Sequence, residues 1–496
     1  MRTLEWLMLV LSLPAAVWTI FVRRFWPGWV LLATGVAVML LPFHAAIEGV
    51  HWQMAPIYLA VLLLFYLLIR HMSSARPRPV PMSKLPMSQL IVGWAATLLL
   101  IGGLALCYTI PMFHLSKTTG SWPVATRTLY FVDPSRKETH PRAPRLNREL
   151  VVQLWYPSAT ASGPRAMYRE LKETDLRSSY QAVLKTDNLQ DAPIAPGRFP
   201  VILFNHAWRG FRQRSSYITQ ELASHGFVVV GISHPYNAAK VMLHDGSVAD
   251  GRSQTDLGDF YSKPTLSLEQ RMAMADNEMR IQTDDDKFVL DQLAAIDRST
   301  TNPLAGHMDL THVGAFGHSF GGSVSAELAS EDSRVLSAIV LDGVLMGPVG
   351  DTGLQKPLFR IKAETPEMPP GSENSPIQST RVHAQMYTLG EGALAASFKR
   401  WGGYNVELRG IDHENFSDKG FFSPFHSLSG IGALPMSRAA TLIDAYIVAF
   451  FEQTLRDQPQ PLLSGAGPSF PEVVHFQIFP GPASAAPAVA ATSAAR

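Results

Sequence analysis

Residues Thr311–Gly322, T-H-V-G-A-F-G-H-S-F-G-G, decide the fold that we expect for this chain. An apolar run at Val313–Phe316 predicts a buried strand, G-x-S-x-G follows it, and Ser323–Ser330 is typical of a helix. Strand, G-x-S-x-G and helix in this order form a sharp turn that lifts a serine hydroxyl above a sheet. The glycines two residues before and after Ser319 leave the room that such a strained turn needs. We therefore predict a nucleophile at Ser319 rather than a serine in an ordinary glycine-rich turn.

The segments around this turn alternate between predicted strands and helices. Phe199–Phe204 and Phe227–Ile232 are short apolar runs typical of strands covered on both faces, and Ser215–Ser224 between them predicts a helix. Strand, helix and strand with short connections form a βαβ unit. We therefore predict the α/β class, with an α/β-hydrolase fold: a mostly parallel central sheet flanked by helices. Further strands are expected at 125–132, 149–156, 335–341, 357–362 and 404–409, further helices at 268–293 and 436–455, and partly helical structure at 168–184.

Four apolar segments precede this part of the chain, at Leu4–Val22, Pro27–Ile47, Val50–Ile69 and Gln89–Phe113. Each approaches the roughly 20 residues that a helix needs to cross a bilayer. Their apolar residues surround each segment rather than forming one stripe, which favours membrane helices over four buried helices of a soluble domain. The sequence therefore predicts four transmembrane helices before the hydrolase fold.

The first segment resembles a signal peptide at Pro14-Ala15-Ala16, but its apolar run continues to Arg23-Arg24, which favours an anchor.

The charged residues that flank these segments predict their orientation. The first loop carries these two arginines, the third carries Arg70, Arg76, Arg78 and Lys84, and the second has no Lys or Arg. Positive loops stay in the cytoplasm. We therefore expect an integral membrane protein, in a bacterial inner membrane, with its catalytic domain on the periplasmic side.

Composition limits the remaining possibilities. The 496 residues are divided, on this interpretation, into a four-helix membrane region (1–115), a catalytic domain (116–460) and a C-terminal extension (461–496) with a disordered Ala/Pro-rich tail. A net charge of +1 gives no reason to expect nucleic acid as a partner. The single cysteine, Cys107, excludes an intramolecular disulfide framework. Oligomeric state cannot be read from these features.

No sequence motif indicates a metal or other cofactor. The sixteen histidines include no H-E-x-x-H, and C-x-x-C is absent, so we expect neither metal nor cofactor. The acidic run Asp284-Asp285-Asp286 within the predicted helix 268–293 could be taken as a metal site. Consecutive residues of a helix do not face one way, so a solvated helix face is the preferred interpretation.

A serine nucleophile needs a base, and in α/β-hydrolases the partners follow in the order serine, acid, histidine. His413 directly follows the last predicted strand and is the best candidate base, while His426 is further from any strand end. The acid stays open on strand positions alone, because Asp342 and Glu364 close successive strands after the nucleophile. Asp412 is expected to shape the loop of its neighbour, His413.

Acyl transfer also needs two backbone donors for the oxyanion. One is expected at Phe320, the residue after the nucleophile, and the other in the loop that follows Phe204. We place the second at Trp208, whose ring can also form a wall of the substrate pocket.

With these residues placed, the chain resembles the platelet-activating factor acetylhydrolase family, in its plasma and intracellular type II branch. The resemblance covers roughly residues 120–455 and is carried by T-R-T-L-Y-F-V-D, V-Q-L-W-Y-P, F-P-V-I-L-F-N-H, E-L-A-S-H-G-F-V-V-V-G-I-S-H-P, G-A-F-G-H-S-F-G-G, V-L-D-G-V-L and D-H-E-N-F-S-D. It implies Ser319 as nucleophile, Asp342 rather than Glu364 as acid, and His413 as base. Trp208 and Phe320 fall on the family's oxyanion donors.

The resemblance also implies a metal-independent serine esterase that removes short or oxidised acyl chains from the sn-2 position of phospholipids. Two departures bear on this expectation: Ala207 stands where the family usually has glycine, and the secreted members lack the four helices. A dienelactone- or polyester-hydrolase-like esterase and a peptidase or amidase on the same fold are the alternatives. A non-catalytic membrane sensor or scaffold with a hydrolase fold is a third.

Overall fold

The computed structural model describes residues 1–21, 26–73, 87–140, 143, 146–251, 263, 265–364, 368–426, 429–465 and 470–482. The chain forms two compact units. The helical unit comprises Met1–His114 with two later segments, Met167–Thr186 and Gly420–His426. The hydrolase unit comprises Leu115–Ala166, Asp187–Lys419 and Ser427–Arg496. Two short segments from later in the chain therefore belong to the same compact unit as the N-terminal helices.

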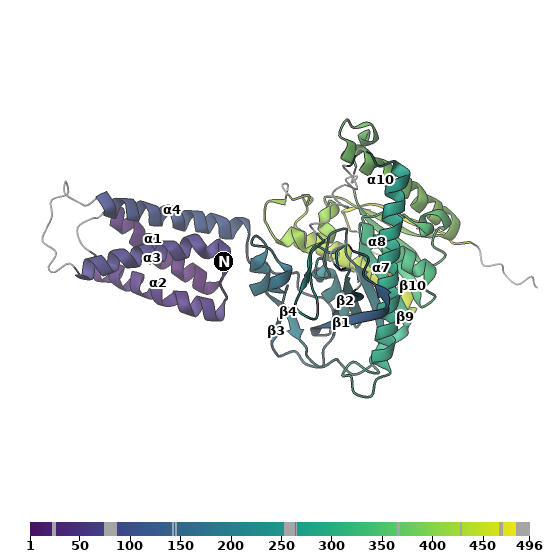
Figure 1. Ribbon diagram of the computed structural model, residues 1–496, viewed down its shortest axis with the longest axis horizontal. Helices are drawn as coiled ribbons and strands as arrows, with labels where there is room; N and C mark the ends of the chain where they lie inside the picture. The colour runs from purple at the N-terminus through teal and green to yellow at the C-terminus, as the bar shows by residue number, and fades with distance from the viewer. Residues whose placement is uncertain are drawn as a thin grey trace, which may run out of the picture. The chain divides into compact units, whose positions relative to one another are not determined.

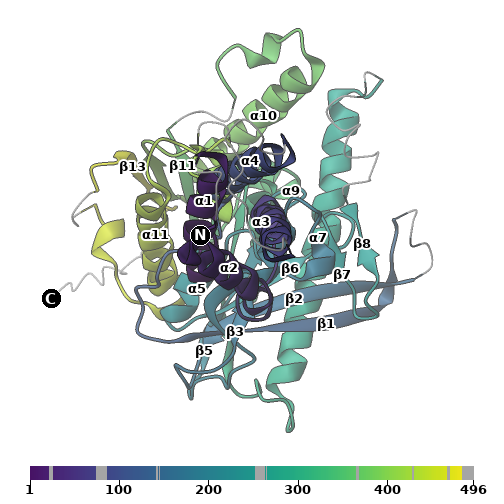
Figure 2. The same cartoon turned by 90° about the vertical axis from the view of Figure 1, so that its left-hand side faces the viewer.

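The helical unit is built from α1 (Thr3–Phe21), α2 (Gly28–Ile47), α3 (Ala55–Ser73, preceded by the 3-10 turn η1 at Trp52–Met54) and α4 (Met87–Thr109), which lie side by side (Figures 1 and 2). All four are long and apolar enough to cross a membrane, as the sequence predicted. The arginines and the lysine of loops 22–25 and 74–86, on which the predicted orientation depends, lie outside the described residues.

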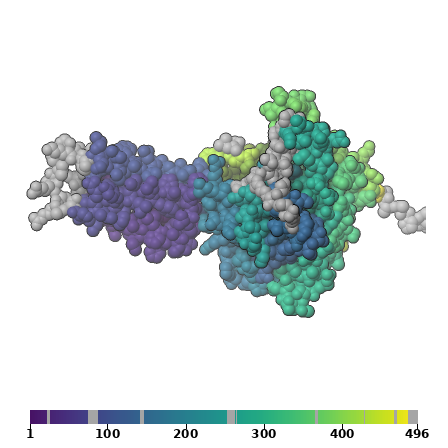
Figure 3. Space-filling view, viewed as in Figure 1, coloured from purple at the N-terminus to yellow at the C-terminus, as the bar shows by residue number. Residues whose placement is uncertain are grey.

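Small residues let these helices approach closely, and large apolar side chains face outward. A side chain at Gly103 would stand 2.5 Å from Ile57, and one at Gly93 would stand 2.6 Å from Thr19. Small residues at helix contacts are typical of membrane bundles. The surface of this unit is the purple and blue part of Figure 3. Large apolar side chains are exposed on this unit; they include Val10, Leu32, Met39, Leu62, Ile91 and Leu98.

The hydrolase unit contains one large sheet. Its strands are β1 (Val124–Lys137), β2 (Asn147–Pro157), β3 (Arg165–Met167), β4 (Lys185–Gln190), β5 (Phe199–Asn205), β6 (Val228–Ser233), β9 (Met308–His318), β10 (Val335–Leu341), β11 (Leu358–Ala363), β12 (Gly403–Leu408) and β13 (Val473–Phe479). Among the described residues their order is β13-β12-β11-β10-β9-β5-β6-β2-β1-β4-β3. The strands from β6 to β12 in this order are parallel, and β2 and β13 join them antiparallel.

The short strands β7 (Val241–Met242) and β8 (Val248–Ala249) form a separate hairpin. The helices of this unit are α5 (Ser216–Ser224), α7 (Leu268–Asp297), α8 (Phe320–Glu331), α9 (Pro348–Thr352), α10 (Gln378–Trp401) and α11 (Met436–Arg456). The predicted strand at 335–341 coincides with β10, and the predicted helix at 436–455 ends one residue before α11 does.

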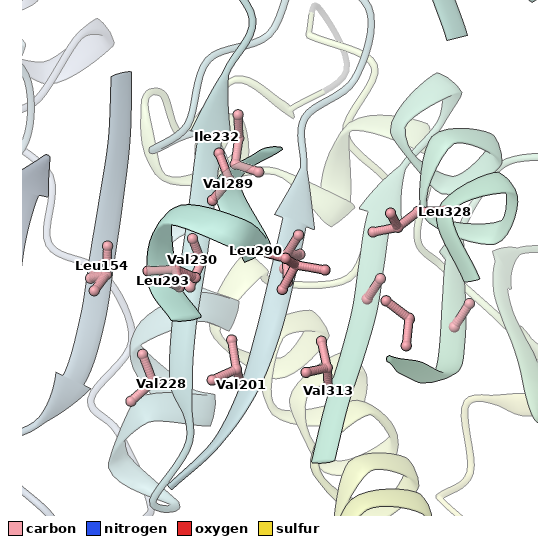
Figure 4. Close-up of a cluster of buried hydrophobic side chains, with 14 of the residues drawn as sticks. Leu154, Val201, Val228, Val230, Ile232, Val289, Leu290, Leu293, Val313 and Leu328 are labelled. Atoms are coloured by element: carbon pink, nitrogen blue, oxygen red, sulfur yellow. The ribbon is translucent and has the colours of Figure 1, made fainter. Parts of the chain in front are cut away.

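Alternating side chains of β9 connect the sheet to helices on both of its faces. Val313 and Ala315 belong to the core cluster that includes α7 and α8. Phe316 points the other way, with its ring 6.4 Å from that of Phe451 on α11. Figure 4 shows Val289 and Leu290 of α7 lying over side chains of the neighbouring strands. Each fully buried Val or Leu contributes about 1.5–3 kcal/mol, so the sheet is a rigid platform for residues at its strand ends.

The acidic run of α7 corrects one sequence prediction. Asp285 and Asp286 are fully buried, not on a solvated face. Asp285 accepts hydrogen bonds from Arg148 Nη2 at 2.6 Å and from His234 Nδ1 at 2.9 Å. Asp286 Oδ2 accepts one from Asn205 Nδ2 at 2.8 Å. Burial of these two groups is tolerated because β2, β5 and the residue directly after β6 supply these partners, none of which is close in sequence.

Two other elements differ from the predictions. Residues 168–184, expected to be partly helical, contain only the 3-10 turns Leu171–Glu173 and Ser179–Val183. Helix α10 was not expected at all, although apolar side chains at Val382, Met386 and Leu394 mark its buried face. The predicted extension 461–496 contributes the edge strand β13, while its residues 483–496 lie outside the described part.

Candidate active site

Ser319 occupies the turn between β9 and α8, as predicted. Its backbone has φ 55° and ψ −122°, a strained conformation for a residue with a side chain. The Ser319 N–H donates to Leu341 O at 2.8 Å, which ties the turn to the end of β10. Its side chain lines a cavity. A strained, well-anchored turn of this kind exposes the hydroxyl at the carboxyl end of the sheet.

The glycines of G-x-S-x-G are required by close backbone contacts. A Cβ at Gly317 would stand 2.0 Å from Gly321 O, and a Cβ at Gly321 would stand 2.2 Å from Asn205 O. Any side chain at either position would force the turn apart. Both glycines are therefore sterically required, as predicted: Gly317 lies against Gly321 within the turn, and Gly321 lies against Asn205 at the end of β5.

His413 and Asp342 form a close pair beside this turn. Asp342 follows β10 directly, with φ 44°, and His413 begins a 3-10 turn (His413–Phe416) after β12. His413 Nδ1 lies 2.7 Å from Asp342 Oδ2, a short, charge-assisted hydrogen bond. The other carboxylate oxygen accepts the Ala363 N–H at 2.9 Å. His413 and Ser319 line the same cavity, and Asp342 bonds to His413, so residues 319, 342 and 413 lie at the same edge of the sheet.

The environment keeps the Asp342 carboxyl ionised. Burial raises the pKa of Asp342, but the hydrogen bond and charge of His413, together with the Ala363 N–H, outweigh burial and lower it below its ordinary value. A carboxylate that accepts from Nδ1 fixes the histidine tautomer with its lone pair on Nε2, the atom that can take a proton from a hydroxyl. The geometry of the pair is therefore that of an oriented base.

The competing candidates lie elsewhere. Glu364 pairs with Arg409 at 3.4 Å on the exposed surface. His426 lines a cavity of the helical unit together with Tyr108. Asp412 caps the turn that begins at His413 and exchanges hydrogen bonds with Asn415, so it shapes this loop as expected.

The two expected oxyanion donors belong to segments that contact each other. The rings of Trp208 and Phe320 pack edge to face with centroids 4.6 Å apart. The Trp208 loop turns tightly, with Gly210 N–H donating to Ala207 O at 2.7 Å and Arg209 at φ 56°. The loop after β5 is thus held against the start of α8, where the backbone donors of an oxyanion site are found in this fold.

The cavity beside Ser319 has a volume of about 320 Å³. Its walls are mostly apolar, and the expected role of Trp208 as a wall is confirmed. Three side chains of α10 also line it, His383, Met386 and Tyr387, which sequence reasoning missed because this helix was not predicted. A pocket of this size and polarity suits a small apolar group next to the Ser319 hydroxyl.

Charged and polar neighbours hold the His413 loop. Glu414 pairs with Arg214 at 2.8 Å and with Lys419 at 3.0 Å. Burial raises the pKa of Glu414, but the charges of Arg214 and Lys419 and the hydrogen bond from Lys419 outweigh burial and lower the value to about 2. Burial and the neighbouring His413 ring lower the pKa of His318 to about 3, so His318 is neutral at pH 7. The Arg214–Glu414 pair was not predicted, since its members are 200 residues apart.

The parallel sheet and the strand–turn–helix at Ser319 define the class of this protein: it has an α/β-hydrolase fold. A solved structure of a ferulic acid esterase from Streptomyces cinnamoneus shares this fold, with a TM-score of 0.56 and 26% identity over 73% of this chain and 99% of that chain. The family described as platelet-activating factor acetylhydrolase, isoform II, matches residues 147–458. The chain belongs to this family, as the motifs predicted.

Individual relatives agree with this assignment. The platelet-activating factor acetylhydrolase of Cavia porcellus is 29% identical over 250 residues, which are 44% of this chain and 56% of that protein. A probable 1-alkyl-2-acetylglycerophosphocholine esterase of Arthroderma benhamiae is 25% identical over 313 residues, 60% of this chain and 70% of that protein. This chain thus spans little more than half the length of the first of these relatives.

Proposed function

We propose that this protein is a membrane-anchored serine carboxylic ester hydrolase. The observation that carries the proposal is the combination of a strained Ser319 with the 2.7 Å hydrogen bond between His413 and Asp342 on the wall of one cavity. A serine hydroxyl, an oriented imidazole and a buried carboxylate at successive strand ends are the requirements of acyl transfer on this fold. Membership of an acetylhydrolase family supports the same chemistry.

In the first half of the reaction, His413 Nε2 takes the Ser319 hydroxyl proton while Oγ bonds to the ester carbonyl carbon. The carbonyl oxygen becomes an oxyanion that accepts from the backbone N–H groups of Trp208 and Phe320. His413 then gives its proton to the alcohol oxygen, the C–O bond breaks, and an acyl-serine remains. Asp342 stays ionised throughout and stabilises the imidazolium through Nδ1.

In the second half, water replaces the alcohol. His413 Nε2 takes a water proton while the hydroxyl bonds to the acyl carbon, and the same two N–H groups stabilise the second oxyanion. Collapse breaks the bond to Ser319 Oγ, which recovers its proton from His413, and the carboxylic acid leaves. Losing one oxyanion donor costs roughly 2.7–4 kcal/mol in a well-studied protease, which is the scale expected for the Trp208 and Phe320 donors.

The substrate class that we propose is an ester with a short or oxidised acyl chain, of the phospholipid sn-2 type. The apolar cavity of about 320 Å³ supports a short acyl group, since a long saturated chain would not fit inside it and would extend into solvent. The acetyl esters named for the family relatives support the same preference. Four apolar helices would keep the hydrolase unit at a membrane, where such substrates are found.

A second candidate substrate class is a non-phospholipid ester, of the dienelactone or polyester-hydrolase kind. The similarity to a solved ferulic acid esterase favours it, and Trp208, Phe320 and Tyr387 supply an aromatic wall. A panel of esters that varies acyl length and alcohol group separately decides between the two. Strong dependence on a glycerophospholipid alcohol favours the first class, and equal rates with aryl or simple alkyl esters favour the second.

Replacing Ser319 with alanine tests the reaction. Hydrolysis of p-nitrophenyl acetate should disappear in Ser319→Ala while the protein stays folded, and retained turnover would refute the mechanism. Comparing an ester with its matched amide tests the peptidase alternative. A protein that hydrolyses neither substrate and fails to react with a fluorophosphonate probe would instead be the sensor or scaffold.

The membrane arrangement is a separate part of the proposal. We place the hydrolase unit on the periplasmic side of a bacterial inner membrane, from the distribution of Arg and Lys among the loops. A phosphatase reporter fused near Gly120 should be active because that segment would be exported. A silent phosphatase, with an active cytoplasmic reporter at the same position, would reverse the orientation.

A further inference from the structure

A buried cluster of polar side chains lies at one end of the helical unit. Glu5 is on the first turn of α1, His44 is near the end of α2, and His51 precedes η1. All three are buried, and one ligand atom from each lies within 4.8 Å of the other two. Ionisable side chains within apolar helices are costly and mark functional sites. This cluster has no part in the proposed ester hydrolysis.

Hydrogen bonds orient His51 toward Glu5. Gln53 Nε2 donates to Ile110 O at 3.3 Å, so its Oε1 faces His51 Nδ1 at 2.9 Å and must accept a hydrogen bond from the Nδ1–H group. In the neutral ring the Nε2 atom then carries a lone pair, yet it lies 2.9 Å from Glu5 Oε1, another acceptor. Two lone pairs at this distance repel unless a proton or a metal cation lies between them.

His44 has the same orientation. Its Nδ1 lies 3.1 Å from the Tyr58 hydroxyl, and its Nε2 lies 3.3 Å from Arg2 Nη2, which can only donate. Nε2 therefore carries the lone pair of this ring as well, and it lies 3.5 Å from Glu5 Oε1. Outer partners that bind Nδ1 and turn Nε2 inward are the usual arrangement around metal-binding histidines. A cation bound to Nε2 of His44 would take the place of its 3.3 Å contact with Arg2.

Glu48 offers a fourth ligand atom. Its Oε2 is buried without a hydrogen-bond partner and lies 3.6 Å from His44 Nε2. Four ligands at the corners of a tetrahedron around Zn²⁺ lie roughly 3.3–3.4 Å apart, given metal–ligand bonds of about 2.0–2.1 Å. Glu5 Oε1 lies 2.9 and 3.5 Å from the two Nε2 atoms, and Glu48 Oε2 lies 3.6 Å from one of them, close to that value. Glu48 lies outside the group of three whose ligand atoms are all within 4.8 Å of one another, so a rotation of its side chain would complete the set.

The charges of the cluster also call for a cation. Glu5 and Glu48 carry two negative charges when both histidines are neutral, and Arg2 supplies one positive charge through its 2.6 Å bond to Glu5. One negative charge is left without compensation in a buried site. A divalent cation would supply two positive charges and so more than compensate this negative charge. Arg2 would stay bound to the carbonyl oxygens of Glu48 and Gly49.

We propose that Glu5, His44, His51 and Glu48 bind a divalent first-row transition metal, and that Zn²⁺ fits best. Two imidazoles and two carboxylates are a ligand set that Zn²⁺ accepts in tetrahedral geometry. The site joins the start of α1, the end of α2 and the segment before α3. Its metal would therefore clamp the ends of three helices, a structural role independent of the proposed hydrolase reaction.

The test measures metal bound to the full-length protein in detergent. After chelator treatment and dialysis, the protein is titrated with Zn²⁺ and separately with Co²⁺, and metal content is measured by mass spectrometry. We expect binding to saturate near one ion per chain, with visible d–d absorption of Co²⁺ that reports tetrahedral N/O ligands. Glu5→Gln and His51→Gln should each lose this binding at least tenfold.

His71→Gln is the matched control. His71 lies on α3 of the same unit, where its ring stacks on Trp26, and it is not one of the four proposed ligands. The control should retain the metal and its absorption signal, and Zn²⁺ should raise the Tm of the wild type and of this control but not of His51→Gln. Size-exclusion profiles show which variants are folded. If a variant misfolds, the wild-type titration still decides.

Two results would overturn the proposal. Wild-type protein that binds no Zn²⁺ or Co²⁺ saturably would show that a protonated histidine, not a metal, compensates the carboxylates. Saturable binding that is equal in wild type, Glu5→Gln and His51→Gln would place the metal elsewhere. Neither result affects the ester hydrolase proposal, which is measured with Ser319→Ala in metal-free buffer.

Discussion

Replacing Asp342 with asparagine should nearly abolish turnover without unfolding the protein. Oδ1 of Asp342 accepts the Ala363 N–H at 2.9 Å, and Oδ2 accepts from His413 Nδ1 at 2.7 Å. Asparagine can satisfy the Ala363 N–H only with its oxygen, which turns its NH₂ group toward His413. Nδ1 must then accept a hydrogen bond from this NH₂ group, so the ring proton moves to Nε2, the atom that has to take the proton of Ser319.

The expected loss follows from this change of tautomer. An equivalent exchange in a serine protease lowers kcat about 10⁴-fold. We expect a fall of about 10³- to 10⁴-fold here, or roughly 4–5.5 kcal/mol in the activation free energy. The assay is kcat for p-nitrophenyl acetate, with circular dichroism and Tm measured on the same preparation.

Glu364→Gln is the control for this prediction. Glu364 follows the adjacent strand β11, and its exposed pair with Arg409 at 3.4 Å contributes little to stability. Turnover of Glu364→Gln should stay within about twofold of wild type. The reasoning fails if Asp342→Asn keeps more than about a tenth of wild-type kcat, or if Glu364→Gln loses as much as Asp342→Asn.

Three further predictions concern the surroundings of the site. Glu414→Gln should lower kcat/KM about three- to tenfold by loosening the His413 loop. Because the folded-state pKa of Glu414 is about 2, its carboxylate stabilises the fold above pH 4.5, and this contribution is lost as the pH falls toward 2. In urea unfolding, the free energy of unfolding should therefore fall less on acidification in the variant than in the wild type. Trp208→Ala should raise KM for acetyl esters and shift preference toward longer acyl chains, measured with an acyl-length series, because the wall of the cavity is removed. Gly321→Ala should destabilise the fold by about 3 kcal/mol or more in a thermal melt, since its Cβ would meet the backbone oxygen of Asn205 at 2.2 Å. Gly392→Ala is the control: a Cβ at this position of α10 would have nothing within 4 Å, so the change should be neutral or stabilising in the same melt.

Local sequence was sufficient where local sterics or continuous apolar runs determine structure. The turn at Ser319 could be predicted because only glycine fits at positions 317 and 321, where a Cβ would come within 2.0–2.2 Å of backbone oxygens. Strand β10 was predicted at its observed bounds because a strand covered on both faces is almost continuously apolar, and only Ser337 interrupts this run. The four apolar helices followed from their length in the same way.

Contacts between distant segments could not be predicted from local sequence. From strand positions alone, Asp342 and Glu364 were equally good candidates for the acid. The choice between them depends on which carboxylate faces His413, some 50 to 70 residues later in the chain. Asp285 was expected in solvent since its compensating Arg148 is 137 residues away. The cluster of Glu5, His44 and His51 follows no metal-binding motif for the same reason: three helix ends bring its members together.

The central claim is that Ser319 is the acyl-accepting nucleophile, and direct trapping of the acyl group tests it most directly. The full-length protein is mixed with a p-nitrophenyl ester, quenched in acid within the burst phase and digested for peptide mass spectrometry. We predict that the acyl mass is found on the peptide that carries Ser319, with the same serine labelled by a fluorophosphonate as turnover is lost. Turnover with Ser319 unmodified, or an acyl group on another residue, would contradict the account.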